Sequence, residues 1–150
     1  MSQTNPVRLF VTHCFDKNDD YFRVFEFLES TTNFFYKNCS DPEAIPQSGG
    51  TEAFKEELRR QINLAEAMIC LDSVYQKNRD LLVFQLNAAQ AMEKPIIAME
   101  LFGQVTDISD DIKKRADAVA PWNERIMVDI ILREARHEAT NRWDVVEFEL

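Results

Sequence analysis

Glycine is scarce in this sequence: the 150 residues include three, at positions 49, 50 and 103. A glycine-rich loop that wraps around a phosphate needs several glycines at fixed spacing, so we do not expect a site of that kind. Cysteine is equally rare. Cys14, Cys39 and Cys70 are odd in number and form no Cys-x-x-Cys pair. This pattern favours reduced thiols packed in the core of a cytoplasmic protein.

Long apolar runs are also missing. No run approaches the roughly 20 residues that a membrane-spanning helix needs, and the polar start MSQTNP does not resemble a signal peptide. Positive charge is in deficit, because 17 Lys and Arg face 26 Asp and Glu, for a formal net charge of −9. A nucleic-acid binder needs a basic face, so we expect neither nucleic acid nor membrane as a partner. An anionic small ligand stays open, because the backbone N–H groups of a helix N-terminus can hold one.

The sequence does contain a regular alternation of short apolar runs and amphipathic stretches, and 45% of its residues are hydrophobic. The apolar runs predict strands over residues 7–11, 34–39, 67–71, 96–99 and 118–120. The amphipathic stretches predict helices over residues 21–29, from 51 to 64, over 81–92, from 109 or 110 to 115, and over 124–137. This alternation indicates one α/β domain, with a mostly parallel five-stranded sheet between two layers of helices. We expect the three-layer, flavodoxin-like strand order 2-1-3-4-5.

Caps and loops follow from the polar residues between these elements. Asp20 is predicted to cap the first helix and Thr51 the second, since both side chains can accept a backbone hydrogen bond. Residues 40–50 and 72–79 are predicted to be loops. The tail, residues 138–150, ends in RWDVVEFEL and is predicted to form an added strand or a docking segment.

The polar corner after the first strand is the candidate site, because ligands of open α/β sheets bind at the carboxyl ends of the strands. His13 and Cys14 are neighbours on an extended chain, so their side chains point apart and cannot act as a nucleophile and its base. His13 either lines a pocket or has a structural role. Trp122 either stacks on a ligand or covers the end of the sheet.

Several separated phrases carry a resemblance to a known family. They are VTHCF at 11–15, NDDYFR at 18–23, NCSDP at 38–42, ELRRQI at 57–62, SVY at 73–75, KPII at 94–97, FGQ at 102–104 and APWN at 120–123. In this order and spacing the chain resembles the TIR-like family of the Thoeris type. The resemblance divides the chain into a TIR-like domain over residues 1–137 and a tail over 138–150. The fold that it implies is flavodoxin-like, in agreement with the pattern above.

For active members the resemblance implies cleavage of the nicotinamide–ribose bond of NAD, or its conversion to a cyclic ADP-ribose signal, in anti-phage defence. A glutamate on the third predicted helix, nine residues before the Lys-Pro pair, then stabilises positive charge at the ribose. Here that position is Gln85, and the family's Trp is Leu81. An amide can bind a ribose hydroxyl but supplies no anion, and losing one such contact costs about 3–4 kcal/mol of transition-state stabilisation.

We therefore expect a TIR-like signalling or defence domain with a weakened NAD-cleaving site. Its ligand would be NAD or an ADP-ribose-like nucleotide, with no tightly bound cofactor or metal. The resemblance also implies a homo-oligomer or a defence-system effector protein as partner. The pocket is predicted to include His13, Cys14, Phe15, Asp16, Ser40, Tyr75, Gln85 and Trp122.

Three other functions stay open at this point. The first is an active NAD glycohydrolase or cyclase that uses another carboxylate, such as Asp16, Asp19 or Asp80. The second is an enzyme similar to nucleoside deoxyribosyltransferases, which share the sheet topology and also need a carboxylate near the ribose. The third is a pure protein-interaction scaffold.

Overall fold

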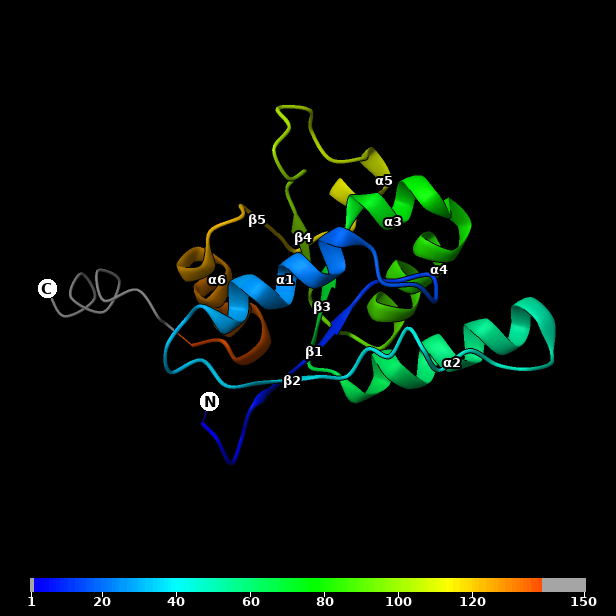
Figure 1. The fold of residues 1–150 in the computed structure, drawn as a ribbon, viewed down its shortest axis with the longest axis horizontal. Coiled ribbons are helices and arrows are strands. Elements are labelled where there is room, and N and C mark those ends of the chain that lie inside the picture. The colour runs from blue at the N-terminus through cyan, green and yellow to red at the C-terminus, as the bar shows by residue number, and fades with distance from the viewer. Residues whose placement is uncertain (1, 139–150) are drawn as a thin grey trace, which may run out of the picture.

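All five strands run parallel in the order β2-β1-β3-β4-β5, which confirms the predicted topology (Figure 1). The structure is a computed structural model, and it describes residues 2–138. The strands are β1 Val7–Val11, β2 Tyr36–Asn38, β3 Ala67–Cys70, β4 Ile96–Met99 and β5 Ala118–Ala120. The helices are α1 Asp19–Glu29, α2 Gly50–Leu64, α3 Asp72–Lys77, α4 Arg79–Ala91, α5 Asp110–Lys113 and α6 Glu124–Arg136.

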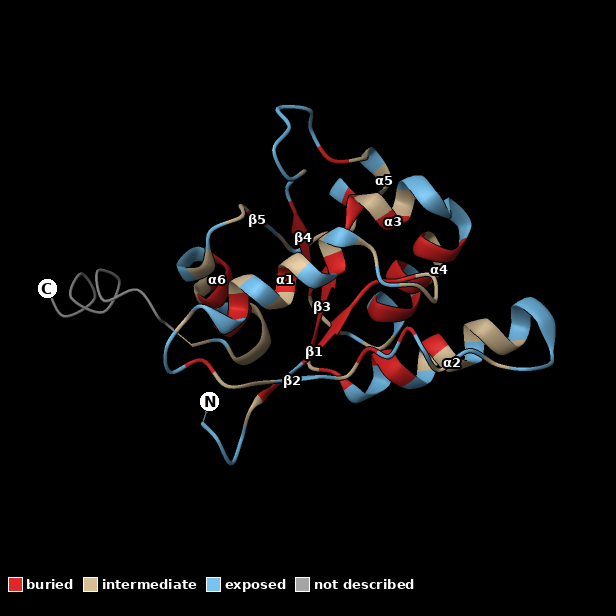
Figure 2. Ribbon diagram, in the orientation of Figure 1, coloured by how far each residue is buried: buried red, intermediate tan, exposed pale blue. Residues whose placement is uncertain are grey.

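Helices cover both faces of the sheet. α1 packs beside α6, and α2 packs beside α4 (Figure 1). Every residue of the central strands β3 and β4 is buried, and the buried positions of Figure 2 are concentrated in the sheet and the inner sides of the helices. Central parallel strands are apolar at consecutive positions because both of their faces lie against helices. The α/β fold is therefore flavodoxin-like, as the alternation of elements predicts.

The predicted helix caps are wrong in two places. Asn18, not Asp20, caps α1: its Oδ1 accepts the Tyr21 N–H at 2.8 Å, because its backbone has the extended conformation of an N-cap. At α2 no side chain caps the helix, and the N-cap is Gly49 with a φ of 99°. A Cβ at Gly49 would lie 2.8 Å from the Cβ of Ala53, so this left-handed start needs a glycine.

Two predicted boundaries also differ from the structure. Residues 72–79 were predicted as a loop, but they contain the helix α3, which Asn78 separates from α4. Six residues are too few to show helical periodicity in a sequence. The second strand is shorter than predicted, since only Tyr36–Asn38 pairs with β1. The prediction of a strand or docking segment in the tail falls on residues 139–150, outside the described residues.

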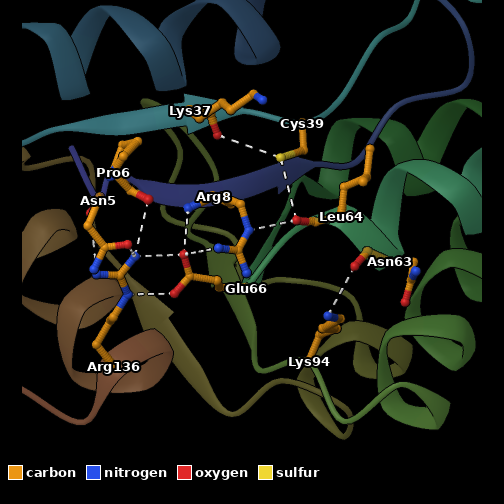
Figure 3. A network of polar contacts seen from close by, with 10 residues as sticks. All are labelled: Asn5, Pro6, Arg8, Lys37, Cys39, Asn63, Leu64, Glu66, Lys94 and Arg136. Carbon is orange, nitrogen blue, oxygen red and sulfur yellow. Dashed lines mark hydrogen bonds and ion pairs between the residues drawn. The ribbon is translucent and has the colours of Figure 1, made fainter. Parts of the chain in front are cut away.

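The amino edge of the sheet is closed by a charged network (Figure 3). Glu66, just before β3, accepts hydrogen bonds from Arg136 Nη2 at 2.8 Å and from the Arg8 N–H at 3.0 Å. Arg136 also donates to the Pro6 carbonyl at 3.1 Å. These bonds fix the end of α6 to the beginnings of β1 and β3. The candidate site lies at the opposite edge, where the strands end.

Candidate ligand site at the carboxyl edge

Gln85 of α4 holds the backbone of His13 directly after β1. Its Oε1 accepts the His13 N–H at 3.2 Å, and its Nε2 donates to the His13 carbonyl at 2.8 Å and to the Leu81 carbonyl at 3.2 Å. The Gln85 side chain is fully buried. A buried backbone beyond the end of a strand needs hydrogen-bond partners, and this amide supplies both. Gln85 therefore holds the chain in place directly after β1.

The ring of His13 is likewise engaged at both nitrogens. Its Nδ1 accepts the Phe15 N–H at 3.0 Å, so the proton lies on Nε2, which donates to Gln61 Oε1 at 2.9 Å. Gln61 in turn bonds both the N–H and the carbonyl of Asp41, at 2.9 and 3.1 Å. Burial lowers the pKa of the imidazole, which favours the neutral ring that this network requires. His13 thus connects β1 to α2 and to the loop after β2.

The residues after His13 form a packed corner. Phe15, at a φ of 65°, contacts the rings of His13 and Phe54, each at 5.1 Å between centroids. Cys14 Sγ donates to Asp16 Oδ1 at 3.5 Å, and Asp16 forms an ion pair with Lys77. Burial, together with the Asp16 charge, raises the pKa of the Cys14 thiol to about 11. This thiol is therefore protonated at neutral pH and is a poor nucleophile.

Three further predicted residues lie in other surroundings. Ser40 Oγ bonds the Tyr21 hydroxyl at 3.0 Å in a buried position. Tyr75 donates to Asp111 Oδ2 at 2.8 Å. Trp122 donates from Nε1 to the Glu100 carbonyl at 2.6 Å. The structure thus brings together His13, Phe15 and Gln85 as one packed cluster, and Ser40, Tyr75 and Trp122 form their hydrogen bonds with other partners.

An open cleft of about 630 Å³ lies at the same edge of the sheet. Its walls come from the start of α1, from α3 and from the loop between β4 and α5, so it opens at the carboxyl ends of β1, β3 and β4. Its lining residues are Asn18, Asp19, Asp20, Arg23, Asp72, Ser73, Gln76, Leu101, Phe102, Gln104, Thr106, Asp107 and Ser109. We call this the carboxyl-edge cleft. A cleft of this size at this place is the usual location of a ligand in open α/β folds.

Asp72 forms one wall of the carboxyl-edge cleft and holds it in shape. It is 5% exposed, and its Oδ1 accepts from the backbone N–H and the hydroxyl of Ser109, at 2.9 and 2.6 Å. Its Oδ2 accepts from Gln76 at 3.1 Å. A single buried carboxylate thus connects the end of β3 to the start of α5. The three donors satisfy the charge that burial would otherwise destabilise.

The opposite wall carries a stacked cation. The Arg23 guanidinium lies 3.8 Å from the centroid of the Phe102 ring and forms an ion pair with Asp20. Phe102 also contacts Trp122, which in turn contacts Phe27 of α1, so aromatic packing connects the loop after β4 to α1. Phe102 stays 43% exposed. The wall therefore carries a partly exposed aromatic ring, with Arg23 stacked on it, beside the Asp20 carboxylate.

Among these lining residues only Asp19 is a candidate from the sequence, as a carboxylate that an active enzyme could use, and the others are not predicted from the sequence. A signal was present, however, because three of the quoted phrases contribute to the walls: NDDYFR at 18–23, SVY at 73–75 and FGQ at 102–104. Within residues 2–138, no group of three His, Cys, Asp or Glu side chains is placed to hold a metal ion. The same residues include no helix long and apolar enough to cross a membrane.

Comparison of the chain with models of known protein families gives no match. Comparison with curated proteins gives no match either.

Proposed function

We propose that this chain is a TIR-like cytoplasmic domain that acts in signalling or defence by binding a small ligand, and that it does not cleave NAD at position 85. One observation carries the proposal: both polar atoms of the Gln85 side chain are occupied by the His13 backbone, and the side chain is fully buried. The flavodoxin-like strand order and the three family phrases that line the carboxyl-edge cleft support the assignment.

The chemistry of NAD cleavage explains why Gln85 matters. Breaking the nicotinamide–ribose bond develops positive charge on the ribose, and a nearby carboxylate stabilises that charge. A neutral amide cannot do so. To reach a ribose, Gln85 would also have to break its hydrogen bonds to the His13 N–H and carbonyl. Each of these buried groups left without a partner costs about 1–3 kcal/mol. The same argument disfavours the deoxyribosyltransferase-like reaction at this position, because it too needs a carboxylate beside the sugar.

Incubation of the purified chain with NAD, at dilute and at crowded concentrations, tests this proposal. We expect no nicotinamide release above a protein-free control. We also expect no gain from Gln85→Glu, because a carboxylate cannot donate to the His13 carbonyl and would be buried beside it. Steady turnover by the unmodified protein would overturn the proposal. Loss of that turnover in Asp16→Ala or Asp80→Ala would then identify the acid used in its place.

Assembly with a second copy or with an effector protein is the second candidate function. The observation that favours it is the exposure of large apolar side chains on the surface. Phe22 of α1 is 49% exposed, Ile126 of α6 is 44% exposed, and Val105 after β4 is fully exposed. Isolated apolar residues are common on surfaces, but contiguous ones mark interfaces. Light scattering over a concentration series, with Phe22→Ser as the variant, tests for self-association.

A further inference from the structure

We propose that residues 146–150 dock on the outer edge of β2 and add a sixth parallel strand to the sheet. This inference does not depend on the ligand proposed above, and it assigns the predicted tail strand a position, a direction and a facing. Four features support it: the alternation of residues in the tail, the outer edge of β2, the surfaces on the two sides of that edge, and the direction of α6.

The sequence of residues 146–150 is VEFEL, in which apolar and acidic residues alternate strictly. Val146, Phe148 and Leu150 share one face of an extended chain, and Glu147 and Glu149 share the other. A period of two residues is typical of a strand with one buried face. A matching surface must therefore offer backbone hydrogen bonds, with an apolar area on one side and positive charge on the other.

The outer edge of β2 offers the backbone groups. In the sheet that residues 2–138 form, β2 is an edge strand that pairs with β1 only. The Phe35 carbonyl accepts a hydrogen bond from β1 at 2.9 Å, and the Cys39 N–H donates one to β1 at 2.7 Å. Alternate residues of a parallel strand bond the same neighbour, so the N–H and carbonyl groups of Tyr36 and Asn38 point away from β1. These groups are placed to bond an added strand.

The α1 side of this edge is apolar. Tyr36 stacks on Phe25 of α1 and on Phe34, with 5.8 Å between the ring centroids in each pair. Two open grooves flank these rings, one of about 610 Å³ and one of about 300 Å³, and Glu29 lines both of them. The apolar residues that line the grooves are Pro6, Phe22, Phe25, Phe34, Phe35 and Tyr36. This surface matches the apolar face of residues 146–150.

The α2 side of the same edge carries Lys37. Successive residues of a strand point to opposite faces, so Lys37 lies on the side away from α1. Its neighbour in the ladder, Arg8, donates to the Leu64 carbonyl at the end of α2 at 2.9 Å. Lys37 is exposed and has no ion-pair partner among residues 2–138, so it can pair with the glutamates of the tail. The opposite facing would place those glutamates beside Glu26 and Glu29.

The direction of α6 determines which edge the tail reaches. α6 follows β5, lies beside α1 and ends at the amino edge, where Arg136 donates to the Pro6 carbonyl at 3.1 Å (Figure 1). A strand after α6 therefore starts at the amino edge and runs parallel to β2. A path from β5 toward β2 over the α1 face has the same hand as the unit β1–α1–β2, and such crossovers are right-handed in nearly all proteins. A strand beyond β5 would require the opposite hand.

The tail is long enough for this path. Pro6, which accepts from Arg136, lines the smaller groove together with Tyr36. Neighbouring strands lie about 4.8 Å apart, so a strand outside β2 is about 10 Å from β1. Residues 139–145 span about 23 Å when extended, which exceeds this distance. The tail can therefore cover an edge that would otherwise be open to pairing with another chain.

Amide hydrogen exchange, followed by NMR on the full chain, tests the proposal. We expect the N–H groups of Tyr36 and Asn38 to exchange at least tenfold more slowly in the unmodified chain than in Phe148→Asp, which places a charge in the apolar face of the tail. The Cys39 N–H, bonded to β1, should exchange at the same rate in both. Asn141→Asp adds the same charge outside residues 146–150 and should leave the exchange of Tyr36 and Asn38 slow.

A charge exchange tests the facing of the added strand. Lys37→Glu should accelerate the exchange of the Tyr36 and Asn38 N–H groups at least threefold, because it would meet two glutamates of the tail. Adding Glu147→Lys and Glu149→Lys to this variant should restore slow exchange. An unchanged rate in Lys37→Glu, or no restoration in the combined variant, would contradict the facing.

Other outcomes overturn the docking itself. Fast exchange of the Tyr36 and Asn38 N–H groups in the unmodified chain would do so, as would slow exchange that Phe148→Asp leaves unchanged. Slow exchange that strengthens with protein concentration would assign this edge to a second copy of the chain instead. Thermal unfolding of each variant shows whether it is folded. Nicotinamide release from NAD tests the proposed function separately, and none of these results alters its outcome.

Discussion

The two edges of the sheet differ in the groups that bond the polar atoms at the strand ends: charged side chains at the amino edge and neutral ones at the carboxyl edge. At the amino edge, Glu66 and Arg136 join the ends of distant segments by charge (Figure 3). At the carboxyl edge, His13, Gln61 and Gln85 join β1, α2 and α4 through neutral groups. Both networks satisfy polar groups that the ends of strands leave without partners.

The difference lies in the charges that remain. The Glu66 charge at the amino edge is fully engaged, with Arg8 and Arg136 around it. At the carboxyl edge the buried network is neutral, and carboxylates such as Asp19 stay at the surface of an open cleft. A ligand site needs unpaired groups on rigid elements. The hydrogen bonds among His13, Gln61 and Gln85, which we call the neutral cluster, hold these elements in place with uncharged groups. The amino edge is thus closed by ion pairs, and the carboxyl edge combines a hydrogen-bonded cluster with an open cleft.

The largest effect is expected from breaking the neutral cluster. Gln85→Leu leaves the buried His13 N–H and carbonyl without partners, which should lower the free energy of unfolding by about 3 kcal/mol. Urea unfolding followed by circular dichroism measures this change. Gln90→Leu, at an exposed position of the same helix, is the matched control and should change stability by less than about 0.5 kcal/mol. Equal effects in the two variants would show that Gln85 does not hold His13 in place.

A smaller loss is expected from the charged network. Glu66→Gln removes the charge that the Arg136 guanidinium faces, and we expect a loss of about 2 kcal/mol, since both side chains are largely buried. Glu56→Gln breaks an exposed ion pair with Arg59 and should cost less than about 1 kcal/mol. Added salt should reduce the Glu56 effect more than the Glu66 effect. A Glu66 variant as stable as the unmodified protein would show that the amino edge needs no charge.

The strands and most of the helices were predictable from the sequence because the patterns that identify them are local. Consecutive apolar residues identify central parallel strands, and β1 and β4 begin and end where the apolar runs do. The caps were less predictable, because Asn18 and Asp20 are both good caps and the backbone conformation at Asn18 decides between them. The helix α3 is too short for periodicity to reveal it.

The site was less predictable because it depends on distant contacts. Gln85 clamps a residue 72 positions away, and nothing in the sequence around Gln85 shows this contact. Asp72 likewise meets Ser109 only after the loop beyond β4 folds over the end of β3. The rule that ligands of open α/β sheets bind at the carboxyl ends of the strands directed attention to this edge. The contacts then separate the cluster around His13 from the carboxyl-edge cleft.

Acid should affect the two edges in different pH ranges. Burial lowers the pKa of His13 below its ordinary value of 6.5, so the unfolded chain binds the imidazole proton more readily than the folded chain does. The stability that the neutral ring provides is therefore complete above pH 6.5 and is lost as the pH falls below that value. The slope can reach about 1.4 kcal/mol per pH unit for one group. The Arg136 hydrogen bond lowers the pKa of Glu66, so its contribution is lost at lower pH, below the ordinary value of 4.5. Unfolding measured from about pH 2 to about pH 8 resolves the two losses.

The two histidines of the chain supply the control for this pH dependence. His13→Gln should abolish the slope below pH 6.5, although it also lowers stability overall. His137→Gln, at the exposed end of α6, should preserve the slope. A slope that survives His13→Gln would assign the acid sensitivity to another group.

The smallest stability effect is expected at Asp19, a surface carboxylate on the wall of the carboxyl-edge cleft. Asp19 is exposed and without an ion pair among residues 2–138, so Asp19→Asn should change the free energy of unfolding by less than about 0.5 kcal/mol, from a weaker interaction with the α1 dipole. Glu66→Gln, the same chemical change at the amino edge, should cost several times more. If Asp19→Asn proves as destabilising as Glu66→Gln, then Asp19 contributes to the stability of the carboxyl edge, and the two edges do not differ in how they use charge. A negligible cost would show that Asp19 is not part of the network that holds the carboxyl edge together, in contrast to Glu66 at the amino edge.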